Sequence, residues 1–129
     1  MKNKIFFNKP LIGKYEKLFI NQVIDNNKFT DGEFQNKTKN LIKNIIKSKN
    51  LELTHSCSSA LEISMLLIDL KKGDEVIMPS YTFTSTANAV LLRGGKPVFV
   101  DVSPTDVNLN YKLVEKKINK KTKAIIVVH

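Results

Sequence analysis

The sequence has a single cysteine, no tryptophan and no long apolar run. One cysteine, Cys57, cannot form an internal disulfide, which is typical of a protein from a reducing compartment. No apolar run approaches the roughly 20 residues that a membrane-spanning helix requires. The first ten residues carry basic side chains but neither an apolar segment nor a small-residue cleavage site, so they do not resemble a secretory signal. We therefore expect a soluble, cytoplasmic protein without a membrane partner.

Basic side chains outnumber acidic ones by 21 to 12, which gives a formal net charge of +9. All the basic residues except Arg93 are lysines, whereas arginine is the better residue for bidentate contacts with phosphates and bases. No aromatic platform on which bases could stack is interleaved with the lysines. The pattern favours a solvated lysine surface and no nucleic-acid partner; a basic nucleic-acid binder is the lowest-ranked alternative.

The first half of the sequence predicts an extended arm followed by helices. Residues 1–13 form the arm, and apolar side chains at helical spacing predict helices over residues 14–25 and 34–46. Residues 51–54 are a short strand candidate. The segment 58–70 is apolar nearly all round, which predicts a buried helix.

The second half alternates strands with helices. Strands are predicted over residues 75–78, 97–101 and 124–128, with helices over 83–92 and 111–118. Such alternation indicates right-handed crossovers and a largely parallel sheet, so the fold class is α/β. The last strand is apolar throughout and should be covered on both faces. Because the sequence stops one residue later, we interpret it as the N-terminal part of a longer protein.

The stretch from Thr54 to Glu62 joins the strand candidate to the start of the apolar helix through small hydroxyl residues. A helix start presents unpaired backbone N–H groups and the positive end of the helix dipole, which together bind phosphate. Ser56, Ser58 and Ser59 are possible hydroxyl donors. The alternative is simple N-capping by one of these serines. Glycine-rich nucleotide-binding patterns are absent.

A second stretch, residues 79–88, follows a strand at its carboxyl end, where α/β sheets place their ligands. An aromatic side chain there is suited to stacking on a flat ligand. The alternative is that Tyr81 and Phe83 belong to the core and the hydroxyls cap the next helix.

These segments match a known family in order and spacing. Residues 56–62 and 73–83, then 97–102 and 122–129, resemble the DegT/DnrJ-type (StrS-like) sugar aminotransferases. The likeness spans nearly the whole chain and is strongest over residues 53–102. It implies the aspartate-aminotransferase fold (fold type I) and pyridoxal 5′-phosphate as cofactor. Residues 1–129 would then comprise an N-terminal arm and helices plus the first part of the cofactor-binding large domain.

The resemblance also implies roles for individual residues. Ser58 and Ser59 match the positions that hold the cofactor phosphate, and Phe83 matches the aromatic residue that stacks on the pyridine ring. The family often has threonine and alanine at the two serine positions, and the hydroxyl at 58 is kept. His129 matches a position near the cofactor cleft. We interpret Cys57 as a small packed thiol and His55 as structural.

The implied reaction is amino transfer, with glutamate as donor, to a dTDP-4-keto-6-deoxy sugar used in cell-surface polysaccharide such as enterobacterial common antigen. Family members act as homodimers. Their Schiff-base lysine and pyridinium carboxylate come after the segment that matches residue 129, and no lysine here lies in a Ser-Phe-His-x-x-Lys context. We therefore assign no catalytic residue and no metal site, and expect no turnover by these 129 residues alone. The alternatives are a non-catalytic product of a truncated gene and a related sugar dehydratase.

Overall fold

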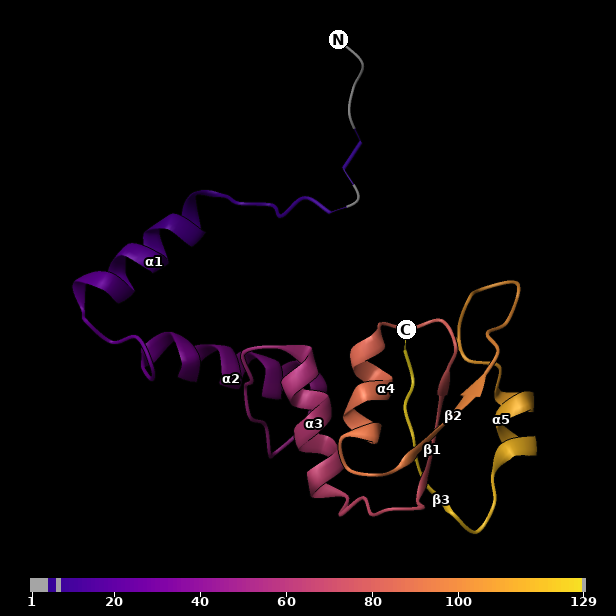
Figure 1. Ribbon diagram of the computed structural model, residues 1–129. Coiled ribbons are helices and arrows are strands. Elements are labelled where there is room, and N and C mark those ends of the chain that lie inside the picture. The colour runs from indigo at the N-terminus through magenta and orange to yellow at the C-terminus, as the bar shows by residue number, and fades with distance from the viewer. Residues whose placement is uncertain (1–4, 7, 129) are drawn as a thin grey trace. The chain divides into compact units, whose positions relative to one another are not determined.

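The computed structural model describes residues 5–6 and 8–128 of the chain (Figure 1). The chain divides into two compact units, residues 1–53 and 54–129, which are considered separately below. Among the described residues, no helix has the length and apolarity needed to cross a membrane. The position of His129 lies outside the described residues, as does part of the predicted arm.

The first unit contains two helices, α1 (Lys14–Asp25) and α2 (Glu33–Ile46), which confirms both helix predictions. The Gly13 amide donates a 2.7 Å hydrogen bond to the Glu16 carboxylate, which also places a negative charge at the positive end of α1. The rings of Phe19 and Phe34 connect the helices, with 5.1 Å between centroids. No residue of either helix is buried.

The second unit is a three-stranded parallel sheet in the order β2-β1-β3, flanked by helices. The α/β fold class with a parallel sheet is therefore confirmed. Its elements in chain order are α3 (Cys57–Leu67), β1 (Glu75–Pro79), α4 (Thr84–Leu91), β2 (Lys96–Val100), α5 (Tyr111–Lys117) and β3 (Thr122–Ile125).

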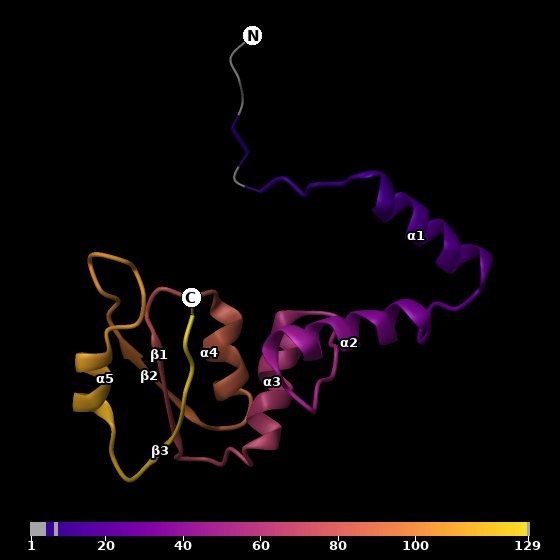
Figure 2. The same ribbon diagram turned by 180° about the vertical axis from the view of Figure 1, so that it is seen from behind.

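Strand β1 is the centre of the core because all five of its residues are buried. Its side chains alternate between faces, as the pleat requires. Val76 and Met78 pack with residues of α3 and α4 on one face, whereas Ile77 packs with Val114 of α5 on the other. The two ribbon views show α3 and α4 on one side of the sheet and α5 on the opposite side (Figures 1 and 2).

Three expectations about individual elements need correction. Residues 51–54 form no strand, because a strand requires a neighbour with free backbone groups and none pairs with them among the described residues. Strand β3 begins at Thr122 and ends at Ile125, earlier than expected, although the Ile126 amide still donates to the Ile77 carbonyl at 2.8 Å.

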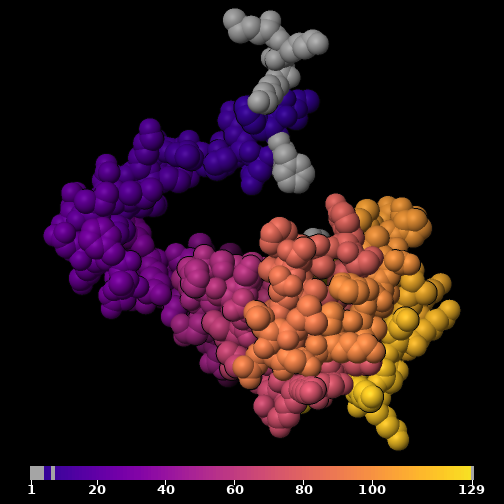
Figure 3. Space-filling model, viewed as in Figure 1, coloured from indigo at the N-terminus to yellow at the C-terminus, as the bar shows by residue number. Residues whose placement is uncertain are grey.

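Helix α3 is also less buried than its composition predicts. Met65 is its only buried residue, and Leu67 is 81% exposed. One side of the helix packs against the sheet and α4, while apolar side chains on the other side face outward. In the space-filling view, the surfaces of α3 and α4 are continuous (Figure 3).

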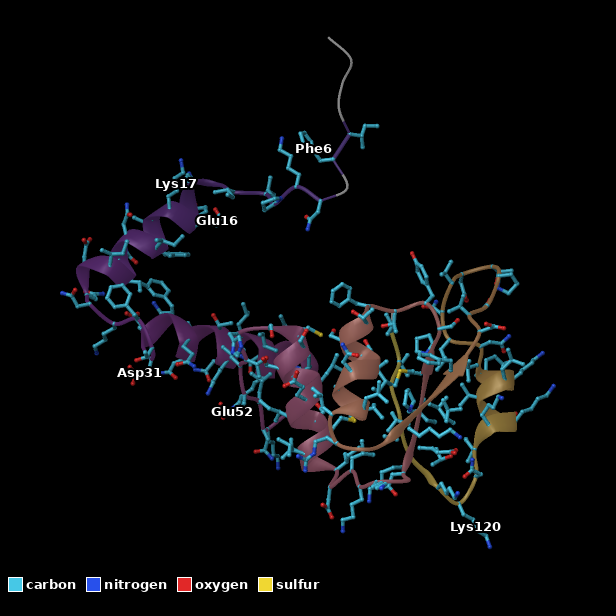
Figure 4. All side chains as sticks on the ribbon, in the orientation of Figure 1. Phe6, Glu16, Lys17, Asp31, Glu52 and Lys120 are labelled. Atoms are coloured by element: carbon cyan, nitrogen blue, oxygen red, sulfur yellow. The ribbon has the colours of Figure 1, made fainter. Side chains whose placement is uncertain are left out.

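The amino end of the sheet is closed by the Glu75 carboxylate. It accepts a 2.8 Å hydrogen bond from Asn119 Nδ2, in the turn between α5 and β3, and one of 3.2 Å from Lys96 Nζ on β2. These partners lower the pKa of Glu75, the Asn119 hydrogen bond having the larger effect. The neighbouring Lys120 side chain extends from the same turn, away from the start of α3 (Figure 4).

Candidate functional site

The candidate site lies at the carboxyl edge of the sheet. Strands β1 and β2 end at this edge, and helices α3 and α4 begin there (Figures 1 and 2). Because α/β sheets bind ligands beyond the carboxyl ends of their strands, this edge is where the fold favours a site. It contains both stretches that the sequence singled out, the start of α3 and the loop that follows β1.

The first turn of α3 presents backbone donors. Ser56 is the N-cap: its hydroxyl oxygen accepts from the Ser59 amide at 3.1 Å, and its carbonyl accepts from the Ala60 amide at 3.2 Å. The amides of Cys57 and Ser58 have no acceptor among the described residues. These two N–H groups and the positive end of the helix dipole form an arrangement suited to an anion.

The two serines predicted to hold a phosphate differ in their hydrogen bonds. The Ser59 hydroxyl lies 3.0 Å from Ser56 Oγ and 3.1 Å from His55 Nε2. The Ser58 hydroxyl has no hydrogen-bond partner among the described residues, and the Ser58 side chain is half-buried. Ser58 is therefore free to donate to a ligand directly, whereas the Ser59 hydroxyl is held by protein groups.

Phe83 occupies the N-cap position of α4, and its side chain is 76% exposed. Tyr81 in the same loop is 70% exposed, so the alternative that both rings belong to the core is wrong. The hydroxyls of Thr82 and Thr86 lie 2.9 Å apart and support the start of α4. Phe83 shares an edge of the sheet with Ser58 and Ser59, but no ring contact or hydrogen bond connects it to them within the described residues.

Asp101 follows β2 at the same edge. The Ser80 hydroxyl donates a long, 3.4 Å hydrogen bond to the Asp101 carboxylate, and the Ser80 amide donates to the Val100 carbonyl at 2.9 Å. These bonds tie the loop after β1 to the end of β2. Asp101 also borders a shallow groove on the α5 side of the sheet, which Leu113 and Lys116 line as well.

Two other polar residues lie at or beside the start of α3. Cys57 is exposed, so the interpretation as a packed thiol is wrong. His55, interpreted as structural, contacts Ser59. No pattern in the sequence indicates this contact, because His55 precedes the N-cap Ser56 and helical spacing does not fix the direction of its side chain. Over residues 5–6 and 8–128, no cluster of three His, Cys, Asp or Glu side chains is arranged to hold a metal ion.

The chain that forms this edge of the sheet matches a known protein family. The profile of the DegT/DnrJ/EryC1/StrS aminotransferase family matches residues 10–129. The chain belongs to this family. That assignment confirms the resemblance seen in the sequence at the level of the family.

Individual relatives cover most of this chain. It is 40% identical over 124 residues to the uncharacterized protein MJ1066 of Methanocaldococcus jannaschii, covering 94% of this chain and 31% of that protein. It is 34% identical to a 3-oxo-glucose-6-phosphate:glutamate aminotransferase of Bacillus subtilis, covering 85% and 25%. The chain thus spans between a quarter and a third of the length of these relatives.

A solved structure that is similar to this chain contains a bound cofactor. The crystal structure of NtdA from Bacillus subtilis with bound PMP superposes on this chain with a TM-score of 0.82 at 31% identity, covering all of this chain and 32% of NtdA. The likeness supports the aspartate-aminotransferase type of fold for this α/β unit.

Proposed function

We propose that the start of α3 and the loop after β1 bind pyridoxal 5′-phosphate, in an enzyme that transfers an amino group from glutamate to a dTDP-linked 4-keto-6-deoxy sugar. The observation that carries the proposal is the pair of amides at Cys57 and Ser58, which have no acceptor among the described residues and lie on the same edge of the sheet as the exposed Phe83 ring. The enzyme would serve cell-surface polysaccharide synthesis and act as a homodimer, as the resemblance implies.

The residues present fit the phosphate and ring of this cofactor. The Cys57 and Ser58 amides and the Ser58 hydroxyl are donors without acceptors among the described residues, and α3 adds its dipole. The exposed Phe83 ring offers a flat apolar face for the pyridine ring. When bound, pyridoxal phosphate supplies an electron-withdrawing ring that stabilises carbanions. The chain's own contribution is to anchor the phosphate and orient that ring.

Support for the donor and the acceptor comes from different sources. Glutamate is named for the Bacillus subtilis aminotransferase that this chain resembles. The dTDP-4-keto-6-deoxy sugar rests on the sequence resemblance alone. No lysine of residues 1–129 lies in a Ser-Phe-His-x-x-Lys context, so we expect this segment by itself to bind cofactor without transferring amino groups.

Binding is tested by titrating the 129-residue chain with pyridoxal 5′-phosphate and, separately, with pyridoxal. We expect the phosphate ester to bind more tightly, and Ser58→Ala to weaken its binding by about three- to tenfold, because a donor to a charged group is lost. Ser64→Ala is the matched control: this exposed α3 hydroxyl donates to the Ala60 carbonyl, away from the first turn. Equal binding of the ester and pyridoxal would contradict the phosphate site.

Amino transfer is tested with protein expressed from the complete reading frame that contains these codons. The protein is loaded with pyridoxal phosphate and given glutamate and dTDP-4-keto-6-deoxyglucose. We expect an amino sugar nucleotide and 2-oxoglutarate in equal amounts by mass spectrometry. Loss of a sugar hydroxyl without gain of nitrogen would instead identify a dehydratase and overturn the proposed reaction.

A further inference from the structure

The His55 ring stands beside the donors of the first turn of α3 without belonging to the helix. Its Nε2 atom lies 3.1 Å from Ser59 Oγ, which lies 3.0 Å from Ser56 Oγ. We propose that His55 is a positioning residue of the phosphate site, acting through this chain of two hydroxyls. The inference rests on the proposed function, because it specifies how the hydrogen-bond donors of the same anion site are oriented.

The chain of hydrogen bonds has two possible directions. If His55 Nε2 carries no proton, the Ser59 hydroxyl donates to it and the Ser56 hydroxyl donates to Ser59 Oγ. The Ser56 hydroxyl proton then points toward Ser59. If Nε2 carries the proton, the ring donates to Ser59 and Ser59 donates to Ser56. In that second direction the Ser56 hydroxyl proton has no acceptor among the described residues and is available to a ligand.

An anion at the start of α3 favours the second direction. The Ser56 oxygen already accepts from the Ser59 amide at 3.1 Å, so Ser56 is fixed as the N-cap in either case. Only the second direction adds the Ser56 hydroxyl proton to the Cys57 and Ser58 amides, for which the described part of the chain offers no acceptor. Phosphate binding therefore shifts the His55 ring toward the tautomer with its proton on Nε2, and a ring in that tautomer strengthens phosphate binding in return.

Two substitutions separate this role from simple packing. His55→Gln keeps an N–H donor on a side chain of similar reach, whereas His55→Leu removes every donor. With inorganic phosphate as the probe, we expect His55→Leu to weaken binding by about three- to tenfold and His55→Gln to retain most of the affinity. Ser64→Ala is again the control, and circular dichroism with urea unfolding verifies that each variant is folded.

Ring nitrogen chemical shifts report the proton directly. The sequence has only two histidines, so the ¹⁵N signals of His55 are assigned by their loss in His55→Gln. We expect saturation with phosphate to move the Nε2 signal toward the protonated position and the Nδ1 signal toward the unprotonated one. A merely structural ring would show no such change.

The outcomes distinguish this inference from the proposed function. If the unsubstituted chain does not bind phosphate, the proposed phosphate site fails and this role fails with it. If the chain binds phosphate but His55→Leu binds equally well, or the ring signals do not move at saturation, only the role of His55 is overturned. Weaker binding in His55→Leu, rescue in His55→Gln and a shifted Nε2 signal together support it.

Discussion

The two ends of the parallel sheet differ in how their polar groups are used. At the amino end, the Glu75 carboxylate is satisfied by Asn119 and Lys96, and Gly95 fits between the Leu70 and Val90 side chains. At the carboxyl end, amides of α3 have no acceptor among the described residues and the Phe83 ring is exposed.

This difference follows from one geometric fact. All strands of the unit run in the same direction, so the helices that follow or precede them begin at one edge and end at the other. Helix starts have spare donors, and they gather at the carboxyl edge. At the amino edge, polar side chains instead connect the strands to one another and to the turn before β3. Changes at the amino end should therefore reduce stability, and changes at the carboxyl end should reduce binding.

The largest effect is expected from Gly95→Ala at the amino end. An added Cβ would lie 2.7 Å from Leu70 Cδ2 and 3.0 Å from Val90 Cγ1, two buried side chains with little room to move. We expect the free energy of unfolding to fall by about 1–2 kcal/mol, measured by urea titration. Phosphate binding by the folded fraction should not change. A free energy of unfolding for Gly95→Ala equal to that of the unsubstituted chain would contradict the tight packing assigned to this end of the sheet.

A smaller effect, on binding alone, is expected from Phe83→Ala at the carboxyl end. Loss of the ring should weaken binding of pyridoxal 5′-phosphate by about three- to tenfold, because a stacking contact of about 1 kcal/mol disappears. Binding of inorganic phosphate should stay the same. Since Phe83 is exposed, the free energy of unfolding should change by less than about 0.5 kcal/mol.

The neighbouring exposed ring provides a matched control for Phe83. Tyr81→Ala removes a similar aromatic area from the same loop and should leave cofactor binding intact. Titration of both variants with pyridoxal 5′-phosphate measures this difference, and equal losses of affinity would mean that the loop binds without a specific stacking residue.

The smallest effect is expected from Glu75→Gln and appears as acid sensitivity. The pKa of Glu75 is lowered in the folded protein, so the ionised carboxylate stabilises the fold at every pH above the ordinary carboxyl pKa. This stabilisation is lost as the pH falls through the lowered pKa. Between about pH 7 and about pH 3, the variant should lose less stability than the unsubstituted chain. The effect is small because the Lys96 side chain is 70% exposed and screened by solvent.

Urea midpoints at the two pH values measure this difference. Glu62→Gln, which changes an exposed carboxylate on α3, is the control and should follow the unsubstituted chain. Identical acid sensitivity in Glu75→Gln and the unsubstituted chain would show that the Asn119 and Lys96 contacts do not stabilise the ionised form.

Sequence patterns predicted the strands and helices of the second unit well because short apolar runs bounded by glycine or proline alternate with helical segments. Strand β1 is largely apolar and ends at Pro79, and a short loop connects it to α4, so the edge that holds the candidate site was predictable. Burial of α3 was not predictable in this way. An apolar composition shows what a helix can bury, but the exposure of Leu67 depends on which elements pack against it.

Side-chain contacts within the site were the least predictable part. Ser58 and Ser59 are chemically identical neighbours, yet only Ser59 is held by His55 and Ser56. That difference depends on the direction in which each Cβ leaves the first helical turn, which composition and spacing do not specify. The family resemblance supplied the cofactor and its expected positions, but not the hydrogen-bond chain that distinguishes the two serines.

Helices α1 and α2 have no buried residue, and this has a consequence for the exchange of their backbone amides with solvent. Helices of 12 and 14 residues receive only marginal support from local propensity, so burial usually decides how long they stay closed. Their amides should exchange at the fast end of the range, while those of β1, whose residues are all buried, exchange only when the whole sheet opens. One chain thus contains segments whose lifetimes in the closed state differ widely.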